Sequence, residues 1–214
     1  VKVIQRVNEC DARKNTEHVD GMLLRVSQFI DKTIFVSDWM KKYFENKGWL
    51  CKNNTFIHNG VDLKNYCPTI EKKQTKKVSV VTHHWSNNIL KGFDAYEFLD
   101  YLAGKNLIDF TYIGRHRNSF LNTICVSPCV GKELADNLKK HDVYVSGSRF
   151  DPGPNHVLEA IACGLPTYVH SDGGGSVEFA GNSHAFKNLS ELESLILRNS
   201  FVKNDYQPTS WKQS

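Results

Sequence analysis

The stretch that decides the fold is residues 148–166, which read SRFDPGPNHVLEAIACGLP. An apolar run at 143–145 comes just before it, and the apolar positions within 157–162 have the spacing of one helix face. The Gly-Leu-Pro at 164–166 is a typical helix end. These features predict a strand, a loop rich in glycine and proline, and a helix, which together form the repeating unit of a parallel α/β sheet.

The same order of elements recurs on both sides of this stretch. After residue 78 we expect strands at 78–82, 110–113, 143–145 and 167–169, and helices at 93–102, 131–140, 155–163 and 189–197. Before residue 62 we expect strands at 1–7, 33–36 and 55–58, and helices at 22–30 and 38–48. The alternation predicts an α/β protein with a doubly wound, Rossmann-like C-terminal domain.

The domain boundaries follow from a polar segment at 62–77, which contains a proline and a run of lysines and is predicted to be an interdomain linker. Residues 1–61 then form the C-terminal part of a first Rossmann-like domain, and 78–200 form the second domain. Residues 201–214 are predicted to begin a closing helix or tail. Since the chain starts inside a strand, we expect a piece of a longer protein, truncated at both ends.

The charge of the chain argues against a nucleic-acid partner. The formal net charge is +4, from 27 basic and 23 acidic residues. Four of the lysines lie together at 72–77, and the remaining basic residues equal the acidic ones in number. A nucleic-acid groove needs basic residues spread along a surface with interleaved aromatic rings. The lysine run is better explained as a solvated loop, and no apolar run reaches the length of a transmembrane helix.

Cysteine and histidine patterns give no support for a metal. The six cysteines show no C-x-x-C pair, so we expect reduced thiols, as in a cytoplasmic protein. Cys163 has the position of a packed apolar residue, and Cys125 and Cys129 are also expected to pack. His83 and His84 point to opposite faces if this segment is extended, and no cysteine or acid nearby completes a metal site.

The start of the helix predicted at 155–163 is the strongest candidate for chemistry. A helix N-terminus at the carboxyl end of a parallel strand presents unpaired backbone N–H groups and a positive dipole end, which suit a diphosphate. Glu159 lies about one turn inside, within reach of ribose hydroxyls, and Asp151 on the loop is placed for a sugar. Asn155 is expected to cap the helix.

At this point the sequence resembles the GT-B fold glycosyltransferases of family 4, the glycosyl transferases group 1 type. That family carries two acidic residues with seven others between them, followed by a motif like L-E-A-x-A-C-G-x-P. Asp151 and Glu159 have this separation, and residues 158–166 match the motif. The first acid of the family is Glu, so Asp151 keeps the charge with a shorter reach.

Weaker matches follow in the family's order along the chain. They are FVSDW at 35–39, IHNGVD at 57–62, Lys91-Gly92, YIG at 112–114, GGGSVE at 173–178 and TSW at 209–211. The resemblance implies that the lysine of Lys91-Gly92 meets the donor diphosphate, and that the glycines at 173–175 let backbone amides approach phosphate or sugar. The family also has an arginine before its Lys-Gly, whereas residues 82–88 read THHWSNN. We expect His83 or His84 to take that place, which makes donor affinity depend on pH between about 6 and 7.5.

The resemblance thus implies a complete donor site. Its catalytic residues are expected to be Asp151, Glu159 and Lys91. Its donor-binding residues are expected to be His83, His84, Lys91, Gly114, Arg115, Val130, Asp151, Gly153, Asn155, His156, Val157, Leu158 and Glu159. Asp11 and Arg13 face the acceptor side.

The implied function is transfer of a sugar from a nucleotide-sugar to a glycan, lipid or protein acceptor, with retention and without a metal or other cofactor. The implied location is the cytoplasm, with peripheral membrane contact through an N-terminal region outside this sequence. The alternative is a nucleotide-sugar binding module without catalytic competence, because the arginine is missing and Asp replaces Glu. A dinucleotide dehydrogenase is not supported, since no G-x-G-x-x-G follows a strand. We expect this chain alone to bind more readily than it catalyses.

Overall fold

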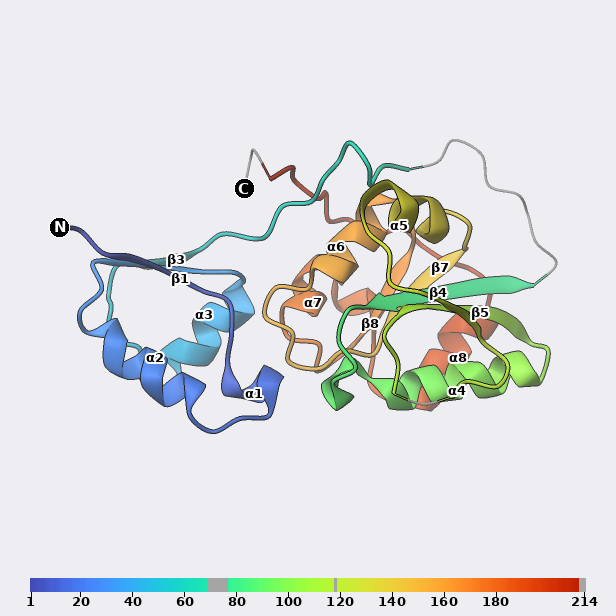
Figure 1. Ribbon diagram of the computed structural model, residues 1–214, viewed down its shortest axis with the longest axis horizontal. Helices are drawn as coiled ribbons and strands as arrows, with labels where there is room; N and C mark the ends of the chain where they lie inside the picture. The colour runs from blue at the N-terminus through green and yellow to red at the C-terminus, as the bar shows by residue number, and fades with distance from the viewer. Residues whose placement is uncertain (69–76, 118, 212–214) are drawn as a thin grey trace.

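The computed structural model describes residues 1–68, 77–117 and 119–211. Within them the chain forms two parallel sheets, each with its own helices (Figure 1). Most of the lysine run lies outside the described residues, so its predicted solvated loop is not described either. The segment after β3 connects the two sheets, and the C-terminal segment runs beside it, as Figure 1 shows.

The first sheet has three parallel strands in the order β1-β2-β3. The strands are β1 (Ile4–Val7), β2 (Lys32–Phe35) and β3 (Asn54–Phe56), and the helices are α1 (Asp11–Lys14), α2 (Val19–Ser27) and α3 (Asp38–Glu45). Phe35 packs against Phe44 of α3 and against Trp49, and these aromatic rings form the centre of a small core. Helices α2 and α3 lie on one side of this sheet (Figure 1).

The second sheet has six strands in the order β6-β5-β4-β7-β8-β9, and every pair is parallel. Its strands are β4 (Val78–His84), β5 (Ile108–Gly114), β6 (Ile124–Val126), β7 (Val143–Ser146), β8 (Thr167–His170) and β9 (Ala185–Phe186). Its helices are η1 (Ile89–Lys91), α4 (Phe93–Gly104), α5 (Gly131–Leu138), α6 (Asn155–Ala162), α7 (Gly175–Ala180), η2 (Asn182–His184) and α8 (Leu189–Leu197).

Helices cover both faces of the second sheet, and the central strand shows why its sequence is apolar throughout. Val80 belongs to the core beneath α4 and α8, whereas its neighbour Val81 belongs to the core beneath α5, α6 and α7. Successive strand residues point to opposite faces, so both faces of a parallel sheet need apolar side chains. All seven residues of β4 are buried.

The strand order places a crevice at the end of β4. The chain proceeds from β4 to β5 and β6 on one side, and then crosses to β7, β8 and β9 on the other side. Where the winding direction reverses, the loops leaving the two adjacent strands separate and open a crevice at their carboxyl ends. His83 and His84 end β4, and Ser146 ends β7, so these residues border that crevice.

The expected doubly wound domain and the strand-loop-helix order are confirmed, with several differences in detail. Strand β4 runs two residues further than expected, to His84. Six short elements were not expected: α1, η1, β6, α7, η2 and β9. Residues 209–211 do not begin a helix, because Ser210 pairs with Val61 as an isolated parallel bridge. No helix among the described residues is long and apolar enough to cross a membrane.

Candidate active site

The central feature of the site is a buried carboxylate held by two cations. Asp151 lies on the loop from β7 to α6, and its side chain is 3% exposed. One oxygen accepts from Arg13 Nη1 at 2.6 Å, and the other accepts from Lys91 Nζ at 2.9 Å. Burial alone would raise the pKa of Asp151, but the charges of Lys91 and Arg13 outweigh it and hold the pKa below 3.8. The carboxylate is therefore ionised at neutral pH.

The glycine loop that follows β8 fixes the backbone of Asp151. The Asp151 N–H donates to the Gly173 carbonyl at 3.2 Å, and the Gly175 N–H donates to the Asp151 carbonyl at 2.8 Å. Gly174 has φ +66°, and a Cβ there would lie 2.8 Å from the Asp151 carbonyl oxygen. The glycines thus let this loop pack against Asp151, and their expected approach to phosphate or sugar stays a prediction.

Glu159, the second acid of the motif, is oriented by groups from two other segments. His83 Nε2 lies 2.8 Å from Glu159 Oε2, and the Tyr66 hydroxyl hydrogen-bonds the same carboxylate. His83 is buried, and its Nδ1 has no hydrogen-bond partner among the described residues. The Glu159 side chain keeps 22% of its surface exposed, so it remains accessible to a ligand.

The other two histidines of the site are neutral hydrogen-bonding groups. His84 Nε2 contacts the Tyr96 hydroxyl, and His156 Nε2 lies 2.9 Å from Ser146 Oγ. Burial lowers the pKa of both imidazoles well below 6.5, and neighbouring positive charges lower it further. His84 is consequently uncharged at neutral pH, which contradicts its expected role as a partial cation. A pH dependence of donor affinity is not expected from His84.

These side chains surround one cavity of about 230 Å³. It is lined by Arg13, His83, His84, Trp85, Ser86, Lys91, Asp151, Gly153, Pro154, Asn155, His156 and Glu159. Helix α6 starts in its wall, and the first N–H groups of a helix have no partner within the helix. The cavity therefore combines two cations, two carboxylates and a positive helix end at the crevice of the second sheet.

Five of the expected donor-binding residues do not line this cavity. Val157 and Leu158 are buried in the core, because the helix face that packs on the sheet cannot also face the cavity. Gly114 lets β5 approach β4, since a Cβ there would meet the His84 carbonyl oxygen at 2.0 Å. The Arg115 guanidinium lies over the Trp85 ring, and Val130 is an exposed residue at the start of α5.

Asn155 and Gly153 take structural contacts from the first domain. Pro154 occupies the cap position of α6 and Asn155 begins the helix, so the expected cap at Asn155 is wrong. The Asn59 side-chain amide donates to Asn155 Oδ1 at 2.8 Å and to the Gly153 carbonyl at 3.2 Å. Asn59 belongs to the Asn-Gly-Val-Asp turn of the motif, and it ties this turn to the donor loop.

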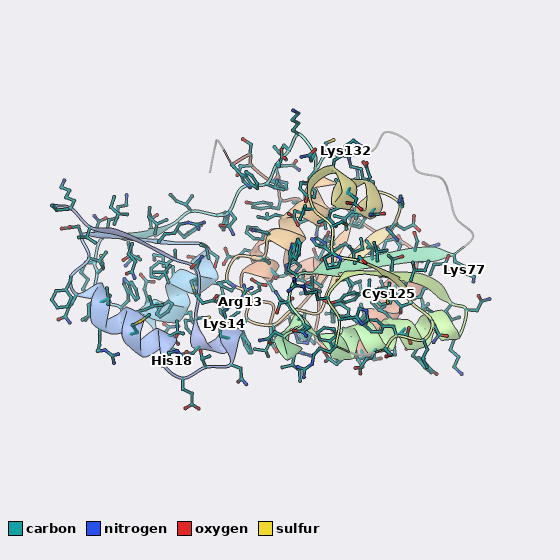
Figure 2. The ribbon with its side chains drawn as sticks, viewed as in Figure 1. Arg13, Lys14, His18, Lys77, Cys125 and Lys132 are labelled. Atoms are coloured by element: carbon teal, nitrogen blue, oxygen red, sulfur yellow. The ribbon has the colours of Figure 1, made fainter. Side chains whose placement is uncertain are left out.

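Arg13 was expected on the acceptor side, and it lines the cavity at the end of β4. Figure 2 places Arg13 and Lys14 where the first domain faces the second. Asp11 instead accepts hydrogen bonds from the Thr16 hydroxyl and from three backbone N–H groups at 18–20. Desolvation would raise the pKa of Asp11, but these hydrogen bonds lower it to about 2. Asp11 thus holds the turn between α1 and α2 and does not point to a substrate.

A second contact between the domains lies at α7, and its residues do not line the cavity. Glu178 accepts from the backbone N–H of Asp38 at 3.1 Å and from that of Trp39, which are the first amides of α3. His58 Nε2 lies 2.9 Å from the same carboxylate. A carboxylate at a helix N-terminus is favoured by the helix dipole.

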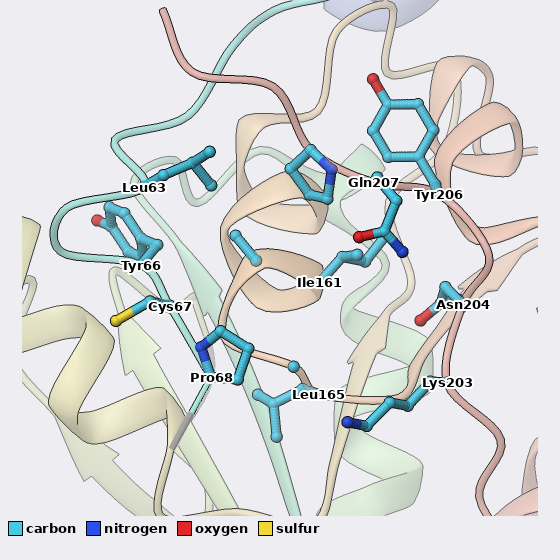
Figure 3. A pocket seen from close by; sticks show the side chains of 13 residues that line it. Leu63, Tyr66, Cys67, Pro68, Ile161, Leu165, Lys203, Asn204, Tyr206 and Gln207 are labelled. Atoms are coloured by element: carbon cyan, nitrogen blue, oxygen red, sulfur yellow. The ribbon is translucent and has the colours of Figure 1, made fainter. Parts of the chain in front are cut away.

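Another cavity, of about 430 Å³, lies between α6 and the C-terminal segment (Figure 3). Lys203 is the charged residue in its described lining, and most of the other lining side chains, such as Leu63 and Ile161, are apolar or uncharged. The smaller cavity carries the charged groups, so we assign the candidate active site to it. No group of three or more His, Cys, Asp or Glu among the described residues is placed to hold a metal ion.

No protein-family model matches the sequence, and no curated protein matches it significantly. Solved structures match in fold at low identity. A TarM variant from S. aureus, in complex with fondaparinux, α-GlcNAc-glycerol and UDP, superposes with a TM-score of 0.74 at 14% identity over 92% of this chain. The chain has the GT-B fold. Sucrose-phosphate synthase from Thermosynechococcus elongatus gives a TM-score of 0.72 at 16% identity over 91% of this chain.

The GT-B fold is also shared with Anabaena HepE in complex with UDP and glucose, at a TM-score of 0.71 and 15% identity over 91% of this chain. This chain spans 43% of TarM, 57% of the synthase and 61% of HepE, or about half the length of these structures. At this low sequence identity, the superpositions establish the fold alone.

Proposed function

We propose that the chain carries the donor site of a glycosyltransferase that moves a sugar from a nucleoside diphosphate to an acceptor, with retention and without a metal. The observation that carries this proposal is the buried Asp151–Lys91 pair beside the N-terminus of α6. A titratable group in a cleft whose pKa is shifted by a specific charge partner, as that of Asp151 is, is a candidate for a functional site. The UDP bound to TarM and HepE in the same fold supports a nucleotide-sugar donor.

The departing diphosphate is the group that needs stabilisation in this reaction. The bond between the anomeric carbon and the diphosphate oxygen breaks, and the acceptor hydroxyl oxygen forms the new bond. The proton of that hydroxyl passes to the departing diphosphate. Lys91 and the first N–H groups of α6 would stabilise the negative charge that develops there.

The two acids have separate roles in the proposed donor complex. Glu159 accepts hydrogen bonds from the vicinal hydroxyls of the ribose, and His83 and Tyr66 orient it for this task. Asp151 accepts from a hydroxyl of the transferred sugar. The acceptor is a glycan, a lipid or a protein, and the reaction takes place in the cytoplasm.

Binding tests the donor site directly. We expect the purified chain to bind at least one of UDP, GDP and ADP in isothermal titration calorimetry. Lys91→Met keeps the length of the side chain and removes its charge, so the Kd should rise by about tenfold or more. Lys132→Met is the matched control, because Lys132 pairs with Asp136 on the surface of α5. Absence of binding for all three nucleotides would overturn the proposal.

Turnover tests the reaction itself. The substrate is a sugar nucleotide that carries the base with the lowest Kd. We expect release of the nucleoside diphosphate in the presence of EDTA. We also expect NMR to show that the product keeps the anomeric configuration of the donor. Loss of turnover on EDTA treatment, or an inverted product, would overturn the corresponding part of the proposal. In a protein with both domains complete, binding without hydrolysis or transfer would favour a nucleotide-sugar binding module.

A further inference from the structure

Arg13 is the cation that the first domain contributes to the cavity. Its guanidinium lies 2.6 Å from Asp151, a residue 138 positions away in the sequence, and its side chain is 28% exposed. It lines the cavity together with Lys91 and Asn155. Arg13 can therefore contact both the loop of Asp151 and a molecule that fills the cavity.

Helix α1 is anchored in a way that fixes the direction of Arg13. Cys10, just before the helix, is completely buried, and Asp11 forms the hydrogen bonds that join α1 to the start of α2. Asp20 accepts from the Asp11 N–H at 2.8 Å and pairs with Lys47. Asn15 ends the helix in the left-handed conformation, with φ 55°. A four-residue helix has little stability of its own, so these contacts are what position Arg13.

The charges around Asp151 favour an anionic ligand at Arg13. Arg13 and Lys91 each bind one oxygen of the same carboxylate. Arg13 Nε also lies 3.4 Å from Glu9, but Glu9 does not line the cavity and pairs with Lys14 as well. Glu159, the other acid of the cavity, is paired with His83. An anion that contacts Lys91 also comes close to Arg13, because both nitrogens touch the same small group. A guanidinium also matches phosphate oxygens in geometry.

We propose that Arg13 binds the diphosphate of the nucleotide donor, so that the first domain supplies one of the two cations of the donor site. This inference rests on the proposed function. In this structure, Asp151 forms ion pairs with both cations, Arg13 and Lys91. When a nucleoside diphosphate enters, Arg13 shifts hydrogen bonds from Asp151 to a phosphate oxygen and joins the first domain to the ligand.

The test separates direct binding from neutralisation of Asp151. In Asp151→Asn the carboxylate is gone, so an arginine that serves only to neutralise it has no remaining task. We therefore compare Asp151→Asn with the double variant Arg13→Gln/Asp151→Asn in titrations with UDP, GDP and ADP. Thermal unfolding of both proteins shows that they are folded at the temperature of the titration.

We expect the double variant to bind the nucleotide about tenfold more weakly than Asp151→Asn, with a shallower dependence of Kd on salt. The matched control is Arg25→Gln/Asp151→Asn, which removes an exposed arginine of α2 and should bind like Asp151→Asn. Arg13→Lys/Asp151→Asn should retain part of the affinity, since the charge is kept and the planar fork is lost.

Equal Kd values for Asp151→Asn and the Arg13→Gln double variant would overturn this inference and leave the proposed function standing, provided that the unmodified chain binds a nucleotide. Failure of the unmodified chain to bind any of the three nucleotides would overturn both.

Discussion

Two carboxylates join the two domains of this chain, and they do so in different ways. Asp151 is held by the side chains of Arg13 and Lys91 and lines the cavity proposed to bind the donor. Glu178 is held by two backbone amides of α3 and by His58. Both are contacts over long sequence separations, yet only Asp151 and its two cations line the cavity.

The difference separates function from stability. A carboxylate that caps a helix satisfies amides that have no other partner, so its removal costs stability in every state of the protein. In the proposed donor complex, by contrast, Arg13 exchanges its hydrogen bond to Asp151 for one to a phosphate oxygen. We therefore expect changes near Glu178 to alter unfolding, and changes near Asp151 to alter nucleotide binding.

The largest effect is expected where the backbone of Asp151 is supported. In Gly174→Ala the new Cβ would lie 2.8 Å from the Asp151 carbonyl at a φ of +66°, so both overpacking and backbone strain apply. We expect a loss of about 3 kcal/mol in the free energy of unfolding, measured by urea denaturation, together with weaker nucleotide binding. Gly48→Ala is the control: φ is +88° but no atom lies within 4 Å, so about 1 kcal/mol is expected. Equal losses for the two variants would show that the Asp151 contact is not tight.

A smaller effect is expected at the cap of α3. Glu178→Ala leaves the N–H groups of Asp38 and Trp39 without their acceptor and should lower the free energy of unfolding by about 2 kcal/mol. The Kd for the nucleotide should stay within about twofold. Glu191→Ala, which removes one exposed hydrogen bond at the start of α8, should cost below about 1 kcal/mol. A large change in Kd for Glu178→Ala would contradict the separation of roles.

The smallest effect concerns pH. The folded-state pKa of Asp151 is lowered, so its ion pairs stabilise the protein above about pH 4 and stop doing so as the pH falls through that lower value. Arg13→Gln removes one cause of the lowering, while burial still raises the pKa. The difference in unfolding free energy between the unmodified chain and Arg13→Gln should therefore narrow as the pH falls from about 6 to about 3. The free energies of unfolding are measured by urea denaturation at each pH, with Arg25→Gln as the control variant. If the curves of free energy against pH for the unmodified chain and Arg13→Gln were parallel, the pairing of Arg13 with Asp151 would be contradicted.

Much of the second domain could be predicted because its signals are local. The period of two in β4 correctly sends His83 and His84 to opposite faces, toward Glu159 and Tyr96 respectively. The helix spacing at 155–163 and the strand-end loops place Lys91 and Asp151 at the same crevice, and the structure brings them together. The same spacing predicts that Val157 and Leu158 lie on the buried face of the helix, and both are in the core.

The remaining features depend on contacts that the sequence does not encode locally. Strand β6 is exposed at the sheet edge and β9 has two residues, so neither shows a clear pattern. The pairing of Arg13 with Asp151 joins residues from different domains, and only the placement of the two sheets reveals it. A run of glycines such as 173–175 allows a loop to approach either a phosphate or a neighbouring backbone, so the sequence does not distinguish the two.

The C-terminal segment that runs beside the connection between the domains has a mechanical consequence. The Val61 N–H donates to the Thr209 carbonyl at 2.9 Å, and Trp211 Nε1 donates to the Gly60 carbonyl. Val61 and Ser210 pair as a single parallel bridge, so the C-terminal segment is fastened to the connection between the domains. A movement of one domain that displaces residues 60–61 must therefore either carry residues 209–211 along or break these hydrogen bonds.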